Sequence, residues 1–123
     1  MSTLKINALQ AVAGGATVPI ADVINGTARA WVNFNGTGTV AIRASYNVAG
    51  ITDNGVGDYA PTFTNAFPDA NYCAGVLFGD DAGGIMGPAT PSGGQTTTSF
   101  RYQTKANGGT LTDCPRVHMS FYR

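Results

Sequence analysis

The chain has 123 residues, the size of one domain, and its seven basic side chains are balanced by seven acidic ones, all of them aspartate. Neutral net charge without a Lys/Arg cluster excludes the electrostatic surface of a nucleic-acid or anionic-membrane binder, and no apolar run reaches the ~20 residues of a membrane-spanning helix. Only 11% of the residues are charged. Either Thr, Asn, Ser and Gly solvate the surface or partner chains cover part of it, and we favour a mixture weighted toward assembly.

Residues 1–28 show little periodic pattern. Leu4 and Ile6 alternate like a short strand, Gly14-Gly15 breaks the segment, and Val18 and Ile20 flank a proline. We interpret this stretch as an arm that docks to a partner through Leu4, Ile6, Val18 and Ile20. A frayed terminus is the alternative.

The two cysteines, Cys73 and Cys114, are expected to be free thiols. The opening MSTLKIN lacks the continuous apolar stretch of a secretory signal, which predicts synthesis in a reducing cytoplasm. A disulfide between them is the alternative and would require adjacent strands with suitable geometry.

A hairpin is predicted from Ala28 to Ser45. Ala28, Ala30, Val32 and Phe34 alternate with more polar residues, Asn35-Gly36 supplies a turn, and a second alternating run follows it.

Extended structure is predicted to continue beyond this hairpin. Residues 46–51 remain extended, 53–57 form a turn, and 59–64 form a strand that Pro61 marks as an edge strand or a bulge. Residues 71–78 (NYCAGVLF) are apolar on both faces, which predicts burial between two layers.

The last third is predicted to be a loop followed by two strands. Residues 79–94 are rich in Gly and Pro, and we weigh a flexible loop against a recognition tip. The candidate recognition residues are Asp80, Asp81, Ile85, Met86, Thr90 and Ser92. Alternation then predicts strands over 96–104 and 116–123, with a turn at 107–109. The whole pattern predicts an all-β fold, a compact antiparallel β-sandwich of jelly-roll-like type over 29–123.

Candidate catalytic and metal-binding residues are few. His118 lies in a strand alternation without a nucleophile motif, so we expect a surface or interface residue. Asp80-Asp81 are neighbours and make a poor acid/base pair. Residues 53–58 have the oxygen-rich look of a calcium loop but lack the EF-hand pattern, and turn chemistry is the better interpretation. We therefore predict no catalytic residue, no metal and no cofactor.

Aromatic and arginine side chains are the remaining candidates. Large rings are expected in the core or at subunit contacts. The packing candidates are Trp31, Phe34, Tyr59, Phe63, Tyr72, Phe100, Tyr102 and Phe121. Arg29, Arg43, Arg101 and Arg116 are predicted on strands opposite the apolar stripes, for pairing with aspartates of other subunits or for a solvated sheet face.

Three blocks of sequence resemble a segment common in structural proteins of tailed phages and prophages. They are AWVNFNGTG (30–38), ITDNGVGDY (51–59) and DANY (69–72), within a similarity that covers roughly residues 28–78. The family is that of small tail-fibre or tail-associated proteins, and it offers no catalytic residues to carry over.

The resemblance implies a virion protein assembled in the host bacterial cytoplasm. It implies a homotrimer that contacts other virion proteins through the arm and a host surface glycan or protein through distal loops, as a tail-fibre or receptor-binding component. A head decoration or head-fibre protein is the first alternative. A small glycan-degrading enzyme, which would need two cooperating aspartates, is the second.

Overall fold

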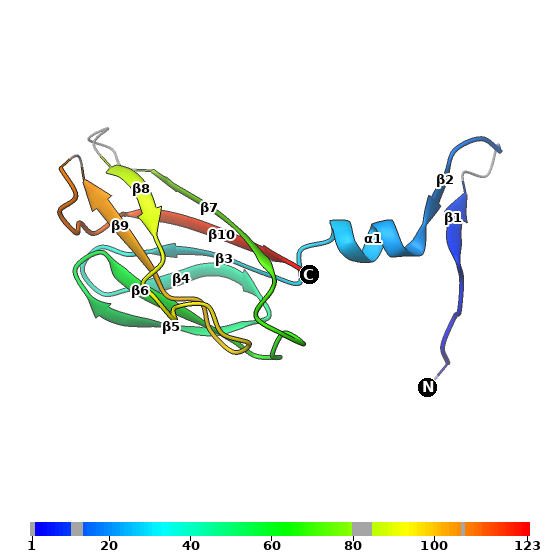
Figure 1. The fold of residues 1–123 in the computed structure, drawn as a ribbon, viewed down its shortest axis with the longest axis horizontal. Coiled ribbons are helices and arrows are strands. Elements are labelled where there is room, and N and C mark those ends of the chain that lie inside the picture. The colour runs from blue at the N-terminus through cyan, green and yellow to red at the C-terminus, as the bar shows by residue number, and fades with distance from the viewer. Residues whose placement is uncertain (1, 11–13, 80–84, 107) are drawn as a thin grey trace.

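A computed structural model of the chain describes residues 2–10, 14–79, 85–106 and 108–123, with the backbone alone for 85–89. This part of the chain holds one short helix and a series of short strands (Figure 1). In chain order they are β1 (Ala8–Gln10), β2 (Thr17–Pro19), α1 (Ile20–Gly26), β3 (Ala30–Asn35), β4 (Ala41–Tyr46), β5 (Val48–Gly55), β6 (Asp58–Phe63), β7 (Cys73–Gly79), β8 (Ile85–Ala89), β9 (Tyr102–Ala106) and β10 (Arg116–Tyr122).

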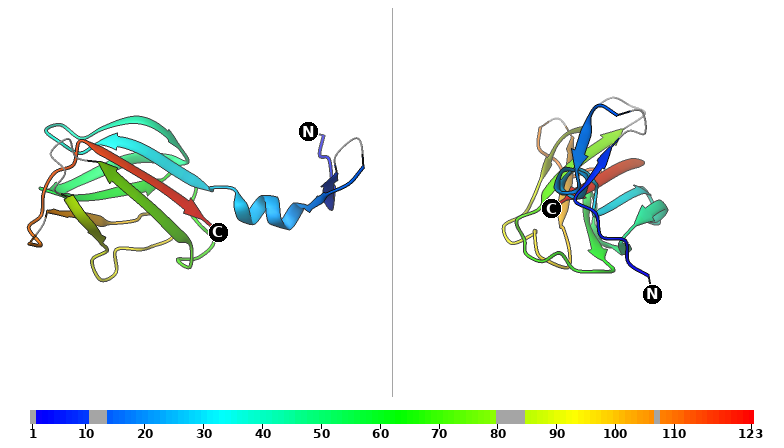
Figure 2. Two further views of the ribbon diagram at one scale, coloured as in Figure 1. Left: turned by 90° about the horizontal axis from the view of Figure 1, so that it is seen from above. Right: turned by 90° about the vertical axis from the view of Figure 1, so that its right-hand side faces the viewer.

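Two four-stranded antiparallel sheets pack face to face, which confirms the predicted all-β sandwich (Figures 1 and 2). The first sheet has the order β4-β3-β10-β7, and the second has the order β5-β6-β9-β8. In the first sheet the last strand lies between β3 and β7, so the two ends of the sandwich sequence pair directly, with Val117 opposite Phe34 and Phe121 opposite Ala30.

The core is made by the inward-facing side chains of the two sheets, and its centre is aromatic. Phe63 of β6 makes edge-to-face contacts with Phe67, Tyr72 and Phe121 at ring-centroid distances of 4.8, 5.7 and 5.0 Å. Such pairs each contribute about 0.5–1.5 kcal/mol beyond the burial of their area. The ring of Phe121 comes from the other sheet, so this cluster holds the two layers together.

Asn47 forms the corner at which the chain passes from the first sheet to the second. It is the sole residue between β4 and β5, and its φ of 55° makes it the one non-glycine with positive φ among the described residues. Asparagine tolerates this left-handed region better than most residues. Its Nδ2 donates to the carbonyl oxygens of Arg29 and Asn65, both at 3.1 Å, and its Oδ1 accepts from the Asn65 N–H at 2.7 Å. The side chain therefore ties three segments together at this corner.

The strongest alternations were predicted correctly. The inner faces of β3 (Ala30, Val32, Phe34) and β10 (Val117, Met119, Phe121) are buried. The Asn35-Gly36 turn joins β3 and β4 as an antiparallel hairpin with a loop through residue 40, and residues 56–57 join β5 and β6.

The prediction that residues 71–78 are buried on both faces is wrong. β7 is the edge strand of the first sheet, and its side chains alternate between partly buried and exposed, with Leu77 75% exposed. β4 forms the opposite edge and is exposed along its whole length, Ile42 and Ala44 included.

Three further predictions need correction. The predicted loop 79–94 contains β8, which pairs with β9. The predicted strand 96–104 begins only at Tyr102, because residues 96–99 form a turn that brings Gln95 opposite Phe100. Leu4 and Ile6 lie outside the first strand, which is Ala8–Gln10.

Pro61 lies in an interior strand, between β5 and β9, and not at an edge. Proline has no N–H to donate toward β9, but the regular pairing of β6 with β9 already ends at Tyr59. The Pro61 carbonyl still accepts a hydrogen bond from the Phe100 N–H at 3.1 Å, so the strand tolerates the proline here.

The N-terminal part of the chain stands away from the sandwich in Figure 1 and in the left view of Figure 2. It consists of the small β1–β2 hairpin and α1, which has no buried residue. We call residues 2–10 and 14–27 the arm. No helix in the described ranges is long and apolar enough to cross a membrane.

Candidate functional site

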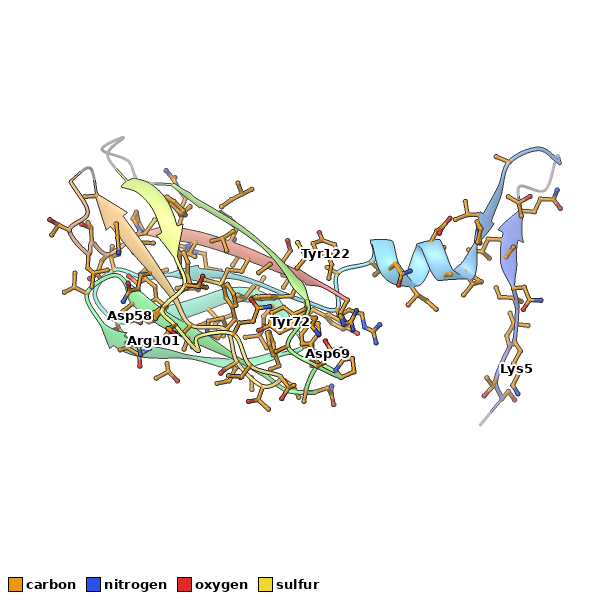
Figure 3. All side chains as sticks on the ribbon, viewed as in Figure 1. Lys5, Asp58, Asp69, Tyr72, Arg101 and Tyr122 are labelled. Atoms are coloured by element: carbon orange, nitrogen blue, oxygen red, sulfur yellow. The ribbon has the colours of Figure 1, made fainter. Side chains whose placement is uncertain are left out.

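Asp58 is the buried carboxylate of the sandwich, and its oxygens are already engaged. Arg101 Nε and Nη2 donate to Oδ1 and Oδ2 at 2.8 and 2.9 Å, and Gln103 Nε2 donates to Oδ2 at 2.7 Å (Figure 3). The Arg101 hydrogen bonds hold the pKa of Asp58 below its ordinary value, although burial opposes this. Asp58 is therefore an ionised structural group and not a proton donor.

Residues 53–58, the possible calcium loop, are the end of β5, a turn at 56–57 and the start of β6, so the predicted turn over 53–57 is shorter than expected. Asp53 Oδ1 accepts the Gly55 N–H at 2.9 Å, and Asn54 donates to Asp58 at 3.3 Å. Within the described residues no three His, Cys, Asp or Glu side chains gather as a metal site. The oxygens of this segment serve the turn, as its Asn/Asp/Gly composition indicates.

A second polar cluster lies at the far end of the sandwich from the arm. The Tyr59 hydroxyl is 2.7 Å from Gly36 O and 3.0 Å from Asp113 Oδ1, and the same Asp113 oxygen accepts the Gly57 N–H at 2.7 Å. Burial, followed by the bond to Asp113, raises the pKa of Tyr59. A tyrosine that holds its proton this firmly connects three loops and supplies no acid or base.

Two other core tyrosines also keep their protons. Burial raises the pKa of Tyr72 to about 12, and its hydroxyl donates to the carbonyls of Thr96 and Ser99. Burial likewise raises the pKa of Tyr102, whose hydroxyl has no hydrogen-bond partner among the described atoms.

Cys73 and Cys114 are not joined by a disulfide, as expected: Cys73 is exposed and Cys114 is buried. Cys114 Sγ lies 3.2 Å from the carbonyl of Gly79, at the opposite end of β7 from Cys73. Six residues of strand span about 20 Å, which is far beyond the reach of a disulfide.

His118 and the arginines are distributed over the surface. His118 is exposed on the outer face of β10, opposite Leu77. Arg101 pairs with Asp58 of its own chain, and Arg43 reaches Pro115 O at 2.8 Å. Arg29 precedes β3 and donates to the carbonyl of Arg123 at 3.0 Å. These side chains do not converge on one site.

The packing candidates lie where the core needs them, with one exception. Seven of the eight are buried: Phe34, Tyr59, Phe63, Tyr72, Phe100, Tyr102 and Phe121. Trp31 instead lies on the outer face of β3, opposite Tyr46 of β4, and the two are 40% and 58% exposed. Tyr122, also exposed, ends β10 on the same side of the sheet (Figure 3).

We call Trp31, Tyr46 and Tyr122 the aromatic patch. It lies at the end of the sandwich from which the arm leaves. Next to it, Tyr46, Arg29 and the Asn47–Asn65 corner line a hollow of about 200 Å³, which is smaller than the pockets that hold drug-sized ligands. Another shallow hollow, of about 380 Å³, lies where the helix meets the sandwich. It is lined by Val23, Ile24, Thr27 and Arg29.

The arm exposes a series of apolar side chains. Of the predicted docking residues, Leu4, Ile6 and Val18 are exposed and Ile20 is half-buried. In the β1–β2 hairpin Val18 lies opposite Leu9, which is also exposed, while Gln10 lies opposite Thr17. The Leu9–Val18 face of the hairpin is therefore apolar, and the other face is mixed, because Ala8 lies opposite Pro19 there.

The recognition candidates are only partly described. Asp80 and Asp81 lie outside the described residues, and Ile85 and Met86 belong to β8, where only the backbone is described. Thr90 and Ser92 are exposed in the connection from β8 to β9.

No protein-family model, curated protein or solved structure matches this chain.

Sequence analysis missed Leu9, Val23, Ile24 and Tyr46 as surface candidates. A signal for two of them is present: Ile20, Val23 and Ile24 have the i, i+3, i+4 spacing of a helix face, directly after Pro19. Leu9 and Tyr46 carry no such signal, because their exposure depends on which strand lies opposite them.

Proposed function

We propose that this chain is a non-enzymatic structural protein of a tailed-phage particle, a tail-fibre or receptor-binding component that contributes to attachment to the host surface. The observation that carries the proposal is the arm: an apolar segment that stands off a complete sandwich and packs against none of its core. A domain that presents such a segment has a surface suited to a partner protein. The three sequence blocks point to the phage context.

The polar clusters of the sandwich support a structural role. Asp58 is neutralised by Arg101, and Asp113 is used by Tyr59 and the Gly57 N–H. A glycan-degrading enzyme would need two carboxylates left available to a substrate, and these two are committed to holding loops.

Electron microscopy of particles labelled with an antibody against the chain tests the proposal. Label at the tail supports it, and particles without label overturn it. Label distributed over the head would replace the tail location by the decoration role.

The hairpin of the arm provides a variant for the same experiment. Leu9→Asp places a charge on the apolar face and is expected to abolish incorporation into particles. Thr17→Asp places the same charge on the opposite face of the same hairpin, beside Gln10, and should leave incorporation intact. Equal incorporation of both variants would contradict docking through this face.

One observation favours the head-decoration alternative. α1 ends at Gly26 and β3 begins at Ala30, so three residues separate the arm from the sandwich and no shaft lies between them. Copy number separates the two roles, because hundreds of copies per particle indicate decoration and a few or tens indicate the tail.

A further inference from the structure

The outer edge of β7 lacks a partner strand. Within the described residues β7 pairs with β10 alone, residue by residue from Cys73 to Gly79, and it ends the first sheet. An edge strand presents a row of unpaired N–H and C=O groups. Such an edge can accept an extended segment of another chain as one further strand.

The core is also incompletely covered along this edge. The inward side chains of β7, which are Ala74, Val76 and Phe78, are only half-buried, whereas those of β10 are at most 3% exposed. A hollow of about 240 Å³ opens here between the two sheets. It is lined by Ala74, Val76, Thr90, Gln95, Phe100 and Tyr102. Apolar side chains that enter from outside would therefore find an apolar wall on both sheets.

The first residues of the arm have the pattern of a strand that fits this place. In residues 3–7 (TLKIN), Leu4 and Ile6 alternate with polar residues, so one face of the extended segment is apolar. The segment belongs to no helix or strand, and Leu4 and Ile6 are 83% and 40% exposed. Because even a two-stranded hairpin is only marginally stable in water, this segment needs an existing sheet edge to form a strand.

We propose that residues 3–7 of one copy add to the β7 edge of a second copy as an antiparallel strand. The first sheet is antiparallel throughout, and antiparallel pairs are slightly more stable per residue than parallel ones. With Leu4 beside Val76 and Ile6 beside Ala74, both apolar side chains enter the hollow at the edge. The added strand then completes the cover of the core.

A second copy is the occupant because the arm holds residues 3–7 away from their own sandwich, and Lys5 lies far from it in Figure 3. The neutral net charge of the chain adds no long-range repulsion between copies. The contact joins two different surfaces, so it is head-to-tail and does not by itself set the number of copies. The Leu9–Val18 face of the hairpin stays available to the particle, so this contact is separate from the proposed attachment role.

The same register determines the outer face of the added strand. Three pairs lie on this face: Asn7 with Cys73, Lys5 with Gly75, and Thr3 with Leu77. The lysine becomes part of the new edge, where a charged side chain discourages a further strand from pairing. Since Cys73 lies opposite Tyr122, the rest of the neighbour's arm leaves the sandwich beside the aromatic patch.

Light scattering of the purified full-length chain over the micromolar range tests whether this segment mediates association. The wild type should exceed the single-chain mass. Leu4→Asp should raise the concentration of half-association at least about tenfold, because it places a charge in an apolar hollow. Thr3→Asp adds the same charge on the outer face and should leave the association unchanged. Wild-type chains that stay single, or an equal loss of association in both variants, would overturn the proposal.

Disulfide trapping with the native Cys73 tests the register separately. Asn7→Cys should form a disulfide with Cys73 of another copy on oxidation, and adding Cys73→Ser should abolish that product. Thr3→Cys should not reach Cys73, because four residues of strand place it about 13 Å away, too far for a disulfide.

The mass of the oxidised product and peptide mapping identify which residues are joined. Equal yields from Asn7→Cys and Thr3→Cys would contradict the antiparallel register. A bridge from residue 7 to Cys73 within one chain would mean that the arm returns to its own sandwich, and it would overturn the assignment to a second copy. Neither measurement involves particles, so its failure is distinguishable from failure of the attachment role.

Discussion

Arg101 and Asp58 form a two-pronged ion pair across 43 positions of sequence, with Nε–Oδ1 and Nη2–Oδ2 distances of 2.8 and 2.9 Å. Asp58 begins β6, directly after the β5–β6 turn, and Arg101 directly precedes β9. The pair therefore joins the ends of two neighbouring strands in the second sheet. Because the Asp58 side chain is buried and that of Arg101 is 45% exposed, the pair lies at the boundary between core and solvent.

Replacement of Asp58 by asparagine is expected to lower the free energy of unfolding by about 1–2 kcal/mol. This loss of stability is smaller than for a fully buried ion pair because solvent reaches Arg101. Asp53→Asn is the control: Asp53 is exposed, and asparagine keeps the Oδ1 that accepts the Gly55 N–H. Urea unfolding of both variants checks the prediction. Identical midpoints would show that the pair contributes nothing.

Stability should fall in acid because of the same residue. The pKa of Asp58 is lower in the folded chain than its ordinary value of 3.8, so the unfolded chain binds a proton first as the pH drops. The stabilisation is complete above about pH 5 and is lost as the pH falls through the folded-state pKa. Urea midpoints between about pH 6 and pH 3 should decline less steeply in Asp58→Asn than in the wild type. The variant keeps some slope, because Arg123 lowers the pKa of Asp69 too.

Two buried tyrosines should respond in opposite ways to loss of their hydroxyl groups. Tyr59→Phe removes the contacts to Gly36 and Asp113 and should cost about 1–2 kcal/mol. Tyr102→Phe removes a hydroxyl without a partner among the described residues and should be neutral or stabilising by up to about 1 kcal/mol. Denaturant midpoints measure both. A larger loss for Tyr102→Phe than for Tyr59→Phe would reverse the assignment.

Gly57 and Gly38 offer a matched pair, since their φ angles are 61° and 62°. At Gly38 a Cβ meets nothing within 4 Å, so Gly38→Ala should cost only the backbone strain of about 1–2 kcal/mol. At Gly57 a Cβ would lie 2.6 Å from Thr112 N and 2.7 Å from Thr104 O. Gly57→Ala should therefore cost at least about 3 kcal/mol. Equal melting temperatures would contradict this close approach.

Trp31 is the single tryptophan and provides an optical signal for association. Its side chain is 40% exposed in one chain, and coverage of the aromatic patch should shift its emission to shorter wavelength as concentration rises. If the emission stayed constant over a hundredfold dilution across the association range, the aromatic patch would not be covered by association.

The sandwich was predictable where the alternation is strongest. Ala30, Val32 and Phe34 in β3, and Val117, Met119 and Phe121 in β10, alternate with mostly polar residues, Trp31 excepted, so period two identifies both the strand and its buried face.

Burial of both faces of β7 was predicted wrongly because Leu77 is an apolar residue of the kind found in cores, although it faces solvent. Sequence alone cannot separate burial within one chain from an apolar surface left at a sheet edge. β8 was missed for the opposite reason: Gly87 and Pro88 suggest a loop, and the strand forms through long-range pairing with β9.

The candidate site was predictable only in part. Val18 and Ile20 were identified as docking candidates, but α1 was not predicted, because the i, i+3, i+4 spacing of Ile20, Val23 and Ile24 covers only one turn of a seven-residue helix. Tyr46 and the corner at Asn47 depend on how the two sheets are joined. No local pattern encodes that connection.

The free edge of β7 has a consequence for handling the protein. Its seven residues, Cys73–Gly79, pair regularly with β10 on one side, and they include no lysine, no proline and no bulge. Lysine, proline and bulges at edge strands are features that keep sheet proteins from pairing edge to edge with other chains. Concentrated stocks should therefore polymerise edge to edge on storage, and a single Gly75→Lys change should extend their shelf life.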